Sequence, residues 1–203
     1  GMTSAHDTLL QNVSRETFTK LETYVATLLK WNARINLIDR KTESDIWHRH
    51  ILDSHQLVQL IPASASTLID YGSGGGLPAL VIAACLPHLS VSCVERDGRK
   101  CAFLTEAARL MKLNNLRVCH DDASTMNGGF DVITARAFTS LNTLLTQAIH
   151  HTHADSICLF PKGKTHATEI EQAKKDWGFT LTLVPSVTDS QARILRVSNL
   201  KRL

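Results

Sequence analysis

The chain has 203 residues, with 43% apolar and 20% charged side chains, which fits one globular domain and excludes disordered, collagen-like and coiled-coil proteins. Lys and Arg outnumber Asp and Glu by 22 to 19, and a net charge of +3 is too small to indicate a nucleic-acid partner. Gly1 before Met2 is typical of a cleavage remnant.

No segment is predicted to enter a membrane or to direct secretion. The first thirty or so residues lack a basic-then-apolar signal pattern, and the longest uncharged run, residues 71–94, is broken by glycines and prolines. Five cysteines without C-x-x-C spacing favour reduced thiols in the core and a cytoplasmic location. They are Cys85, Cys93, Cys101, Cys119 and Cys158.

The N-terminal part is predicted to be helical. Residues 14–30 carry an apolar stripe on one face, and Ser14 is placed to cap that helix. A second helix is predicted over 44–61, where Pro62 ends it. The residues expected to face inward from it are Ile46, Leu52, Leu57, Leu60 and Ile61. Residues 2–63 are therefore predicted to form an N-terminal helical extension.

From residue 64 the pattern changes to strands that alternate with helices. Strands are predicted over 67–71, 91–95, 116–119, 130–134 and 156–160. Helices are predicted over 78–85, 98–112, 139–150 and 166–176. This alternation is typical of a parallel, doubly wound α/β sheet. The last two strands, 179–184 and 193–197, have no helix between them and should form an antiparallel hairpin at one edge. Residues 64–203 are therefore predicted as a Rossmann-like domain with a mostly parallel seven-stranded sheet.

A glycine-rich loop follows the first strand of this domain and opens a helix, which is the context of a nucleotide-type site. It reads Asp70-Tyr-Gly72-Ser73-Gly74-Gly-Gly76-Leu77-Pro78. Glycines let backbone N–H groups approach a ligand, and proline suits the first turn of a helix. Gly74 to Ala79 fits the dinucleotide pattern G-x-G-x-x-A. Asp70-x-Gly72-x-Gly74-x-Gly76 instead fits class I S-adenosylmethionine-dependent methyltransferases.

Three features favour the methyltransferase. Asp70 can hold the ammonium group of S-adenosylmethionine, directly or through water, and NAD has no such group. Glu95 ends the second strand, where its carboxylate can accept both ribose hydroxyls, although it would serve NAD equally. The terminal antiparallel hairpin is typical of the methyltransferase sheet.

Asp122-Ala123 follows the third strand at the mouth of the same crevice, where Asp122 can accept from the adenine amino group or be an ordinary loop carboxylate.

The nucleophile that receives a methyl group decides which residues a site needs. A ring carbon needs a thiolate, typically from a Pro-Cys pair, which the chain lacks. An exocyclic adenine amine is usually met by an (Asn/Asp)-Pro-Pro-(Tyr/Phe) loop, and the corresponding position here reads Thr134-Ala-Arg136-Ala-Phe138. A purine N7 offers an in-plane lone pair, so positioning and electrostatics suffice. Arg136 can donate to guanine O6 or to a phosphate.

Each of the other polar clusters allows two interpretations. His50 and Asp53 can hydrogen-bond on one helix face, whereas His48 and His50 could ligate a metal, and we favour the hydrogen-bond network without metal. The histidines at 150, 151 and 153 fit a contact with a helix end better than a zinc site. Lys162 and Lys164, at the end of the fifth strand, fit either a contact with a phosphate group or a turn exposed to solvent. The basic rim predicted around the crevice consists of Arg96, Arg99, Lys100, Arg136, Lys162 and Lys164.

Several elements along residues 31–163 together resemble one known family. They are Trp31-Asn32-x-x-x-Asn36-Leu37, Arg49-His50-x-x-Asp53-Ser54, the glycine loop, Glu95, Lys100-x-x-Phe103-Leu104, Asn115, Thr134-Ala135-Arg136-Ala137 and Lys162-Gly163. The chain resembles the glucose-inhibited division protein B family, the bacterial 16S ribosomal RNA guanine-N7 methyltransferases.

This resemblance implies a class I methyltransferase fold and transfer of a methyl group from S-adenosyl-L-methionine to guanine N7 in the 530-loop of 16S ribosomal RNA. The residues implied to hold the cofactor are Asp70, Gly72, Ser73, Gly74, Gly76, Leu77, Pro78, Glu95, Asp122, Ala123 and Arg136. Those implied to meet RNA are Arg49, His50, Lys100, Arg136 and Lys162, with Arg136 also the catalytic residue. The partner is then 16S rRNA or the 30S subunit, and the chain is expected to act as a monomer without metal.

The chain departs from the family pattern at two places. Asp122-Ala123-Ser124 stands where the family usually has Arg-Ala-Glu, and Ala79 stands where it usually has glycine. Three alternatives remain: an NAD-dependent oxidoreductase, a ribosome-binding assembly module with a vestigial pocket, and a methyltransferase with another substrate. The sequence also leaves open whether the substrate is naked rRNA, a precursor particle or the complete small subunit.

Overall fold

Apolar residues that alternate between two faces build a seven-stranded sheet. The computed structural model describes residues 4–136 and 139–203, so the first residues of the predicted extension and Ala137 of the Thr-Ala-Arg-Ala element lie outside the described residues. The strands are β1 (Thr67–Tyr71), β2 (Ser90–Glu95), β3 (Leu116–His120), β4 (Val132–Ala135), β5 (Ile157–Lys162), β6 (Trp177–Pro185) and β7 (Arg193–Arg202). Their order in the sheet is β3-β2-β1-β4-β5-β7-β6.

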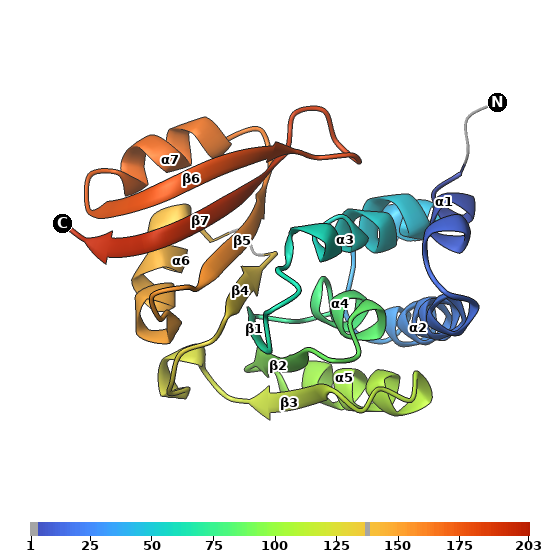
Figure 1. Ribbon diagram of the computed structural model, residues 1–203. Helices are drawn as coiled ribbons and strands as arrows, with labels where there is room; N and C mark the ends of the chain where they lie inside the picture. Colours follow the sequence, from blue (N-terminus) through green and yellow to red (C-terminus); the bar gives the residue numbers. More distant parts are fainter. Residues whose placement is uncertain (1–3, 137–138) are drawn as a thin grey trace.

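The pairing confirms the predicted topology. The first five strands are parallel, and β7 pairs antiparallel with both β5 and β6. The hairpin at the edge is longer than predicted, since β7 continues to Arg202, with Asn199, Lys201 and Arg202 exposed. This is the fold of a doubly wound α/β domain that ends in an antiparallel hairpin (Figure 1).

Helices cover both faces of the sheet (Figure 1). On one face lie α4 (Ala79–Cys85) and α5 (Gly98–Leu110), and on the other α6 (Leu141–Ala148) and α7 (His166–Ala173). Neighbouring strand residues divide between the two cores: Leu68 packs with the α4 and α5 side, whereas Ile69 packs with the α6 and α7 side. The period of two along each strand therefore fills both cores.

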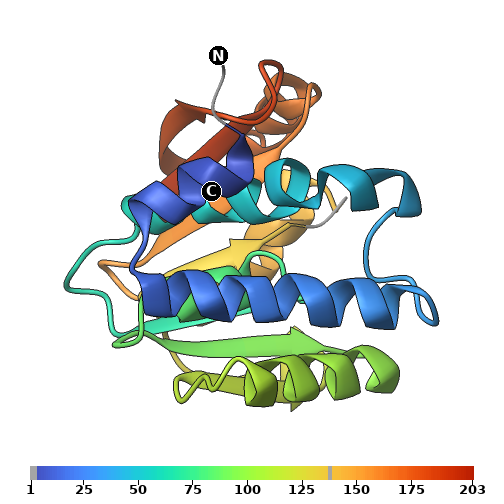
Figure 2. The ribbon, with the colours of Figure 1, turned by 90° about the vertical axis from the view of Figure 1, so that its right-hand side faces the viewer.

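The N-terminal helices pack onto the α4 and α5 face. Ser14 caps α2 (Arg15–Asn32), as predicted, and this helix lies between α1 (Ala5–Asn12) and α5 (Figure 2). The boundary predicted between residues 63 and 64 falls in the turn that precedes β1. A preceding helix, α1 (Ala5–Asn12), was not predicted, because its only buried residue is Leu9 and it shows no apolar stripe.

The prediction of one regular helix over 44–61 is wrong, because this segment is divided into several short helical turns. The segment consists of η1 (Arg40–Asp45), a π-helical turn η2 (Trp47–Leu52), α3 (Asp53–His55) and η3 (Val58–Leu60). Asp39 starts the series by accepting a hydrogen bond from the Lys41 N–H. Of the residues expected to face inward, Leu52 and Leu60 are only half-buried. π-Turns of this kind are frequent at functional sites.

The chain reverses direction across the sheet between β1 and β4. From β1 it proceeds through β2 to β3, and it then returns to place β4 on the other side of β1. In open α/β sheets such a switch point opens a crevice at the carboxyl ends of the strands. The glycine loop follows β1 and Arg136 follows β4, so both lie at this crevice.

Two expectations concern the rest of the chain. No helix within residues 4–136 and 139–203 is both long and apolar enough to cross a membrane. All five cysteines are free; Cys93, Cys101 and Cys158 are buried, and Cys85 and Cys119 are half-buried.

Candidate active site

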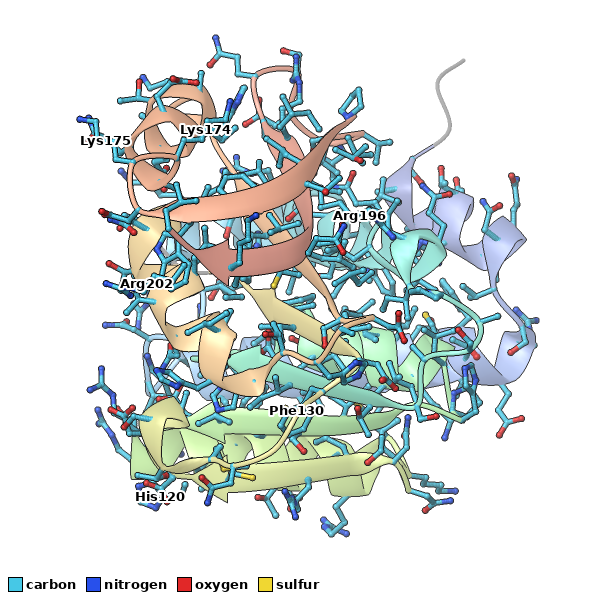
Figure 3. All side chains as sticks on the ribbon, turned by 60° about the vertical axis from the view of Figure 1, so that its left-hand side comes forward. His120, Phe130, Lys174, Lys175, Arg196 and Arg202 are labelled. Atoms are coloured by element: carbon cyan, nitrogen blue, oxygen red, sulfur yellow. The ribbon has the colours of Figure 1, made fainter. Side chains whose placement is uncertain are left out.

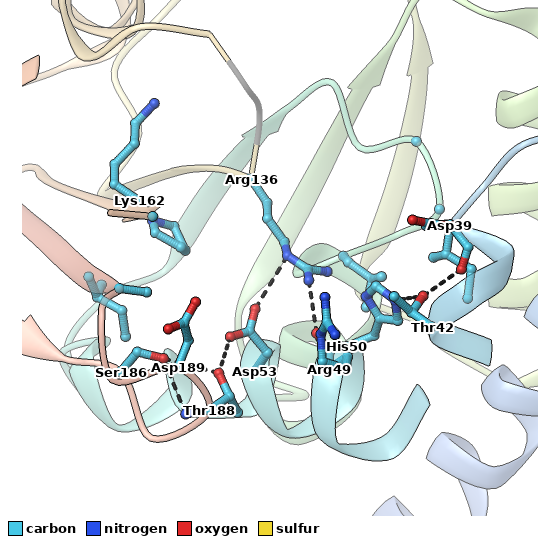
Figure 4. Close-up of a pocket in the computed structure, with 18 of the residues that line it drawn as sticks. Asp39, Thr42, Arg49, His50, Asp53, Arg136, Lys162, Ser186, Thr188 and Asp189 are labelled. Carbon is cyan, nitrogen blue, oxygen red and sulfur yellow. Dashed lines mark hydrogen bonds and ion pairs between the residues drawn. The ribbon is translucent and has the colours of Figure 1, made fainter. Parts of the chain in front are cut away.

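A cavity of about 880 Å³ opens at the carboxyl edge of the sheet (Figure 4). Four parts of the chain contribute to its walls: the glycine loop, the N-terminal segment from Leu37 to Gln56, the residues around the end of β5, and the connection between β6 and β7. Arg136 after β4, Lys100 from α5 and Glu169 from α7 complete the lining. Segments that are far apart in sequence thus line one cleft at the switch point between β1 and β4.

The glycine loop adopts backbone angles that other residues rarely take. The φ angles of Gly72, Gly74 and Gly76 are +61°, +50° and +86°. A Cβ on Gly72 would meet nothing within 4 Å, which leaves that side of the loop open to a ligand. A Cβ on Gly76 would instead lie 2.8 Å from Leu80 Cγ. Gly76 is therefore required for packing, whereas Gly72 leaves room.

The N-terminal helices hold this loop from outside. The Tyr24 hydroxyl in α2 donates to the Gly75 carbonyl at 2.5 Å. A Cβ on Gly75 would lie 3.0 Å from the carbonyl oxygen of Leu37, so the segment after α2 touches the loop. Asn32 fixes that segment by accepting from the N–H groups of Leu37 and Ile38 at 2.9 and 3.0 Å. The extension is thus part of the site.

Asp70 lies behind the loop and does not line the cavity. Its fully buried carboxylate accepts from the hydroxyls of Ser73 and Thr134, both at 2.7 Å. Burial raises the pKa of Asp70 to about 7, against the lowering effect of these two hydrogen bonds. Ser73 does line the cavity, and its hydrogen bond to Asp70 connects the buried carboxylate to the cavity wall.

Glu95 sits beside the loop at the end of β2. One carboxylate oxygen accepts from the Gly74 N–H at 2.8 Å, and the other accepts from the Asp97 N–H at 2.9 Å. Each carboxylate oxygen has a second lone pair, so both can still accept a ligand hydroxyl. The side chain is oriented by backbone donors on two sides.

The turn after β3 lies next to Glu95 but outside the cavity lining. Asp121 N–H donates to the Glu95 carbonyl at 3.0 Å, which places the turn at the end of β2. Asp122 accepts from the Ser124 N–H at 2.9 Å, and this contact together with Arg96 at 3.4 Å lowers its pKa. Ala123 is buried beneath it.

Arg136 is held by the N-terminal segment (Figure 4). Its Nε lies 3.3 Å from Asp53 Oδ2, and its Nη2 donates to the Arg49 carbonyl at 2.9 Å. Asp53 Oδ1 accepts from the Thr188 hydroxyl at 2.5 Å and from Gln56 Nε2 at 3.1 Å. The hydrogen bond expected between His50 and Asp53 is wrong, because these other partners occupy Asp53. Thr188 and Gln56 were not singled out from the sequence.

His50 is a neutral residue in the wall of the cavity. Its Nε2 lies 2.7 Å from the Thr42 hydroxyl, which itself donates to the Asp39 carbonyl, so we assign the ring proton to Nε2. Burial, and then the charges of Arg136 and Arg49, lower the pKa of His50 to about 4. Its Nδ1 is buried and has no partner among the described residues.

The predicted basic rim is only partly assembled. Lys100, Arg136, Lys162 and Lys164 line the cavity, whereas Arg96 and Arg99 do not and instead lie near Asp122 and Asp97. Arg193, which was not singled out, also lines it. Other basic side chains, such as Lys174, Lys175 and Arg202, lie on the side of α7 and the hairpin (Figure 3).

Lys162 is buried despite its charge. Its ammonium lies 3.1 Å from Glu169 Oε1 and also donates to the Thr139 carbonyl. Glu169 in turn accepts from the Leu141 N–H at 2.9 Å, so both groups fix the start of α6. Only 5% of the Lys162 side chain is exposed.

The histidines near residue 150 have structural partners. His151 lies 2.5 Å from the Tyr71 hydroxyl and 3.0 Å from the Met126 carbonyl, and His153 pairs with Asp131 at 2.7 Å. The predicted helix-end contact is wrong for these two side chains. In the part of the chain that the structure describes, no group of three His, Cys, Asp or Glu residues could hold a metal ion.

Comparison with known proteins gives a consistent result. Residues 17–196 match the family model described as rRNA small subunit methyltransferase G. The chain is 44% identical over 196 residues to the ribosomal RNA small subunit methyltransferase G of Jannaschia sp., covering 93% of this chain and 91% of the relative. It is 39% identical over 194 residues to that of Gluconobacter oxydans, covering 96% and 100%.

Solved structures support the fold. A ribosomal protein L11 methylase from Lactobacillus delbrueckii subsp. bulgaricus matches with a TM-score of 0.59 at 19% identity, covering 71% of this chain and 75% of that chain. The mitomycin 7-O-methyltransferase matches with a TM-score of 0.59 at 14% identity, covering 94% and 69%.

Proposed function

The chain belongs to the rRNA small subunit methyltransferase G family, and from that membership we propose that it transfers a methyl group from S-adenosyl-L-methionine to N7 of a guanine in 16S ribosomal RNA. The observation that carries this proposal is one cavity that both the glycine loop and Arg136 line. A methyl donor on the loop would then lie opposite a residue able to orient a base.

The residues around the loop fit this cofactor. Bound S-adenosyl-L-methionine supplies an electrophilic methyl group on its sulfonium. Backbone around Gly72 and Gly74, with Ser73 and Leu77, would hold its methionine part, and Asp70 would act on the ammonium group through Ser73 or water. Glu95 would accept the ribose hydroxyls with its remaining lone pairs. Gly76 and Pro78 would keep the loop in shape.

The adenine would extend toward the turn at Asp122 and Ala123. The lowered pKa keeps Asp122 an acceptor at neutral pH, as an adenine amino group requires. Arg136 would lie between the methyl donor and the base and would act on the base rather than hold the cofactor.

Guanine N7 suits the chemistry of the cavity. Its lone pair is available without removal of a proton, so the residues need only position the base and stabilise charge. The guanidinium of Arg136 keeps N–H donors for guanine O6 after its contacts with Asp53 and Arg49. Lys100, Lys164 and Arg193 would contact phosphates at the rim, together with Arg49, whereas the buried ammonium of Lys162 would act indirectly.

Two rival functions predict different binding. An NAD-dependent oxidoreductase would bind NAD and not S-adenosylhomocysteine, and membership of a methyltransferase family disfavours it. An assembly module would bind 30S subunits without transferring methyl groups. Because the proposed enzyme works on ribosomal RNA, we infer a cytoplasmic location. We also propose that it acts as a monomer and needs no metal.

Calorimetry and a labelled-methyl assay test the proposal. We expect S-adenosylhomocysteine to bind and NAD not to, and we expect label from S-adenosyl-L-methionine to enter 16S rRNA. Arg136→Ala should keep cofactor affinity and lose most turnover. Binding of NAD alone, or 30S binding without transfer of label, would contradict the proposed function.

A further inference from the structure

We propose that Asp53 is a positioning residue: it sets the orientation of Arg136 for methyl transfer and couples that orientation to the connection between β6 and β7. This inference rests on the role proposed for Arg136. It concerns a carboxylate that touches neither the glycine loop nor, in the proposed function, the base.

One segment of the chain holds the Arg136 side chain. Both of its contacts in the described structure are with the segment η2–α3, one with the Asp53 carboxylate and one with the Arg49 carbonyl. The side chains of Arg136 and Asp53 are 26% and 18% exposed, so water screens their attraction only in part. A planar guanidinium that is fixed at two atoms has a defined direction for its remaining donors.

Asp53 also has a partner on the connection between β6 and β7. Its Oδ1 accepts from Thr188, which lies 135 residues later in the chain. Gln56 strengthens this link, because its amide donates to both Asp53 and Ser186 and accepts from the Val187 N–H at 2.9 Å. Asp53 therefore joins the N-terminal segment, the end of β4 and the β6–β7 connection (Figure 4).

The charge of Asp53 is needed to satisfy all these donors at once. Thr188, Gln56 and Arg136 all donate, and a carboxylate is the one side chain of this size that accepts on both atoms. In Asp53→Asn, one amide orientation places an NH2 group against Arg136. The other orientation places it against Gln56 and Thr188. In either case a partner is lost, while the shape of the side chain is kept.

A double-mutant cycle tests the proposal directly. We would measure kcat and KM for methyl transfer to 30S subunits, S-adenosylhomocysteine affinity and Tm for the wild type, Asp53→Asn, Arg136→Ala and the double variant. Asp53→Asn should lower kcat about 10- to 100-fold with unchanged cofactor affinity. In the Arg136→Ala background it should have no further effect, because Asp53 acts through Arg136. Asp45→Asn, an exposed position before η2, is the matched control and should change kcat less than about twofold.

The outcomes separate this inference from the proposed function. Full turnover in Arg136→Ala would contradict the catalytic role of Arg136. Loss of turnover in Arg136→Ala with normal turnover in Asp53→Asn would overturn the inference alone, and so would losses that add in the double variant. If Asp53→Asn fails to fold, Asp53→Glu keeps the charge and should retain more turnover than Asp53→Ser. Equal losses in these two variants, at equal cofactor affinity, would also overturn it.

Discussion

Replacing Asp70 by asparagine should change how the stability of the protein depends on pH. Its carboxylate is fully buried, and burial raises its pKa from 3.8 to about 7. Between these values the folded state binds more protons than the unfolded state, so the contribution of Asp70 to the free energy of unfolding falls as pH rises. Between pH 5 and pH 8 the linkage relation gives a loss of roughly 2–3 kcal/mol. Asp70→Asn removes this loss, and its amide can still accept from Thr134.

Urea denaturation at pH 5, 6, 7 and 8 measures the difference. We expect the free energy of unfolding of Asp70→Asn to rise relative to the wild type by roughly 2–3 kcal/mol over this range. Asp155→Asn removes a carboxylate from an exposed turn and should stay parallel to the wild type. Parallel curves for Asp70→Asn would refute the reasoning, because Asp70 would then ionise normally beneath the loop.

Four further variants test the glycine loop and the rim of the cavity. Gly76→Ala should lower the free energy of unfolding by about 1–3 kcal/mol in urea titrations, because its Cβ would collide with Leu80 and its φ is +86°; unchanged stability would contradict this. Gly74→Asp should abolish S-adenosylhomocysteine binding in calorimetry by crowding and repelling the methionine carboxylate, and retained binding would remove the loop from the cofactor site. Lys162→Met should lower Tm, yet leave the salt dependence of RNA binding unchanged, because its ammonium is buried in an ion pair. Lys164→Met should reduce the salt slope by about 1 with little change in Tm, and the reverse pattern would refute both assignments.

Local patterns predicted the sheet and the loop because both are encoded within short segments. The residues Thr67–Tyr71 form a strand and then meet glycines that accept positive φ, and both features are visible in a few letters of sequence. The topology followed from the alternation of strands and helices, since parallel strands need crossover connections. The terminal hairpin followed from the absence of a helix before residue 193.

Tertiary contacts explain what the sequence could not predict. The pairing of Asp53 with Thr188 joins residues 135 positions apart, so the nearer His50 was the natural but wrong partner. The burial of Lys162 depends on Glu169 from the following helix, and a lysine at a strand end otherwise suggests a solvent-exposed cation. The first of the irregular helical turns after residue 39 starts with a hydrogen bond from the Lys41 N–H to the Asp39 carboxylate, a side-chain contact to the backbone that periodicity does not report.

Mapping N7-methylguanine in 16S ribosomal RNA tests the central claim most directly. RNA from cells that contain the protein should carry the modification at one guanine, and RNA from cells without it should lack it. Wild-type protein supplied in trans should restore the modification, and Arg136→Ala should not. The same N7-methylguanine pattern with and without the protein would contradict the proposed activity.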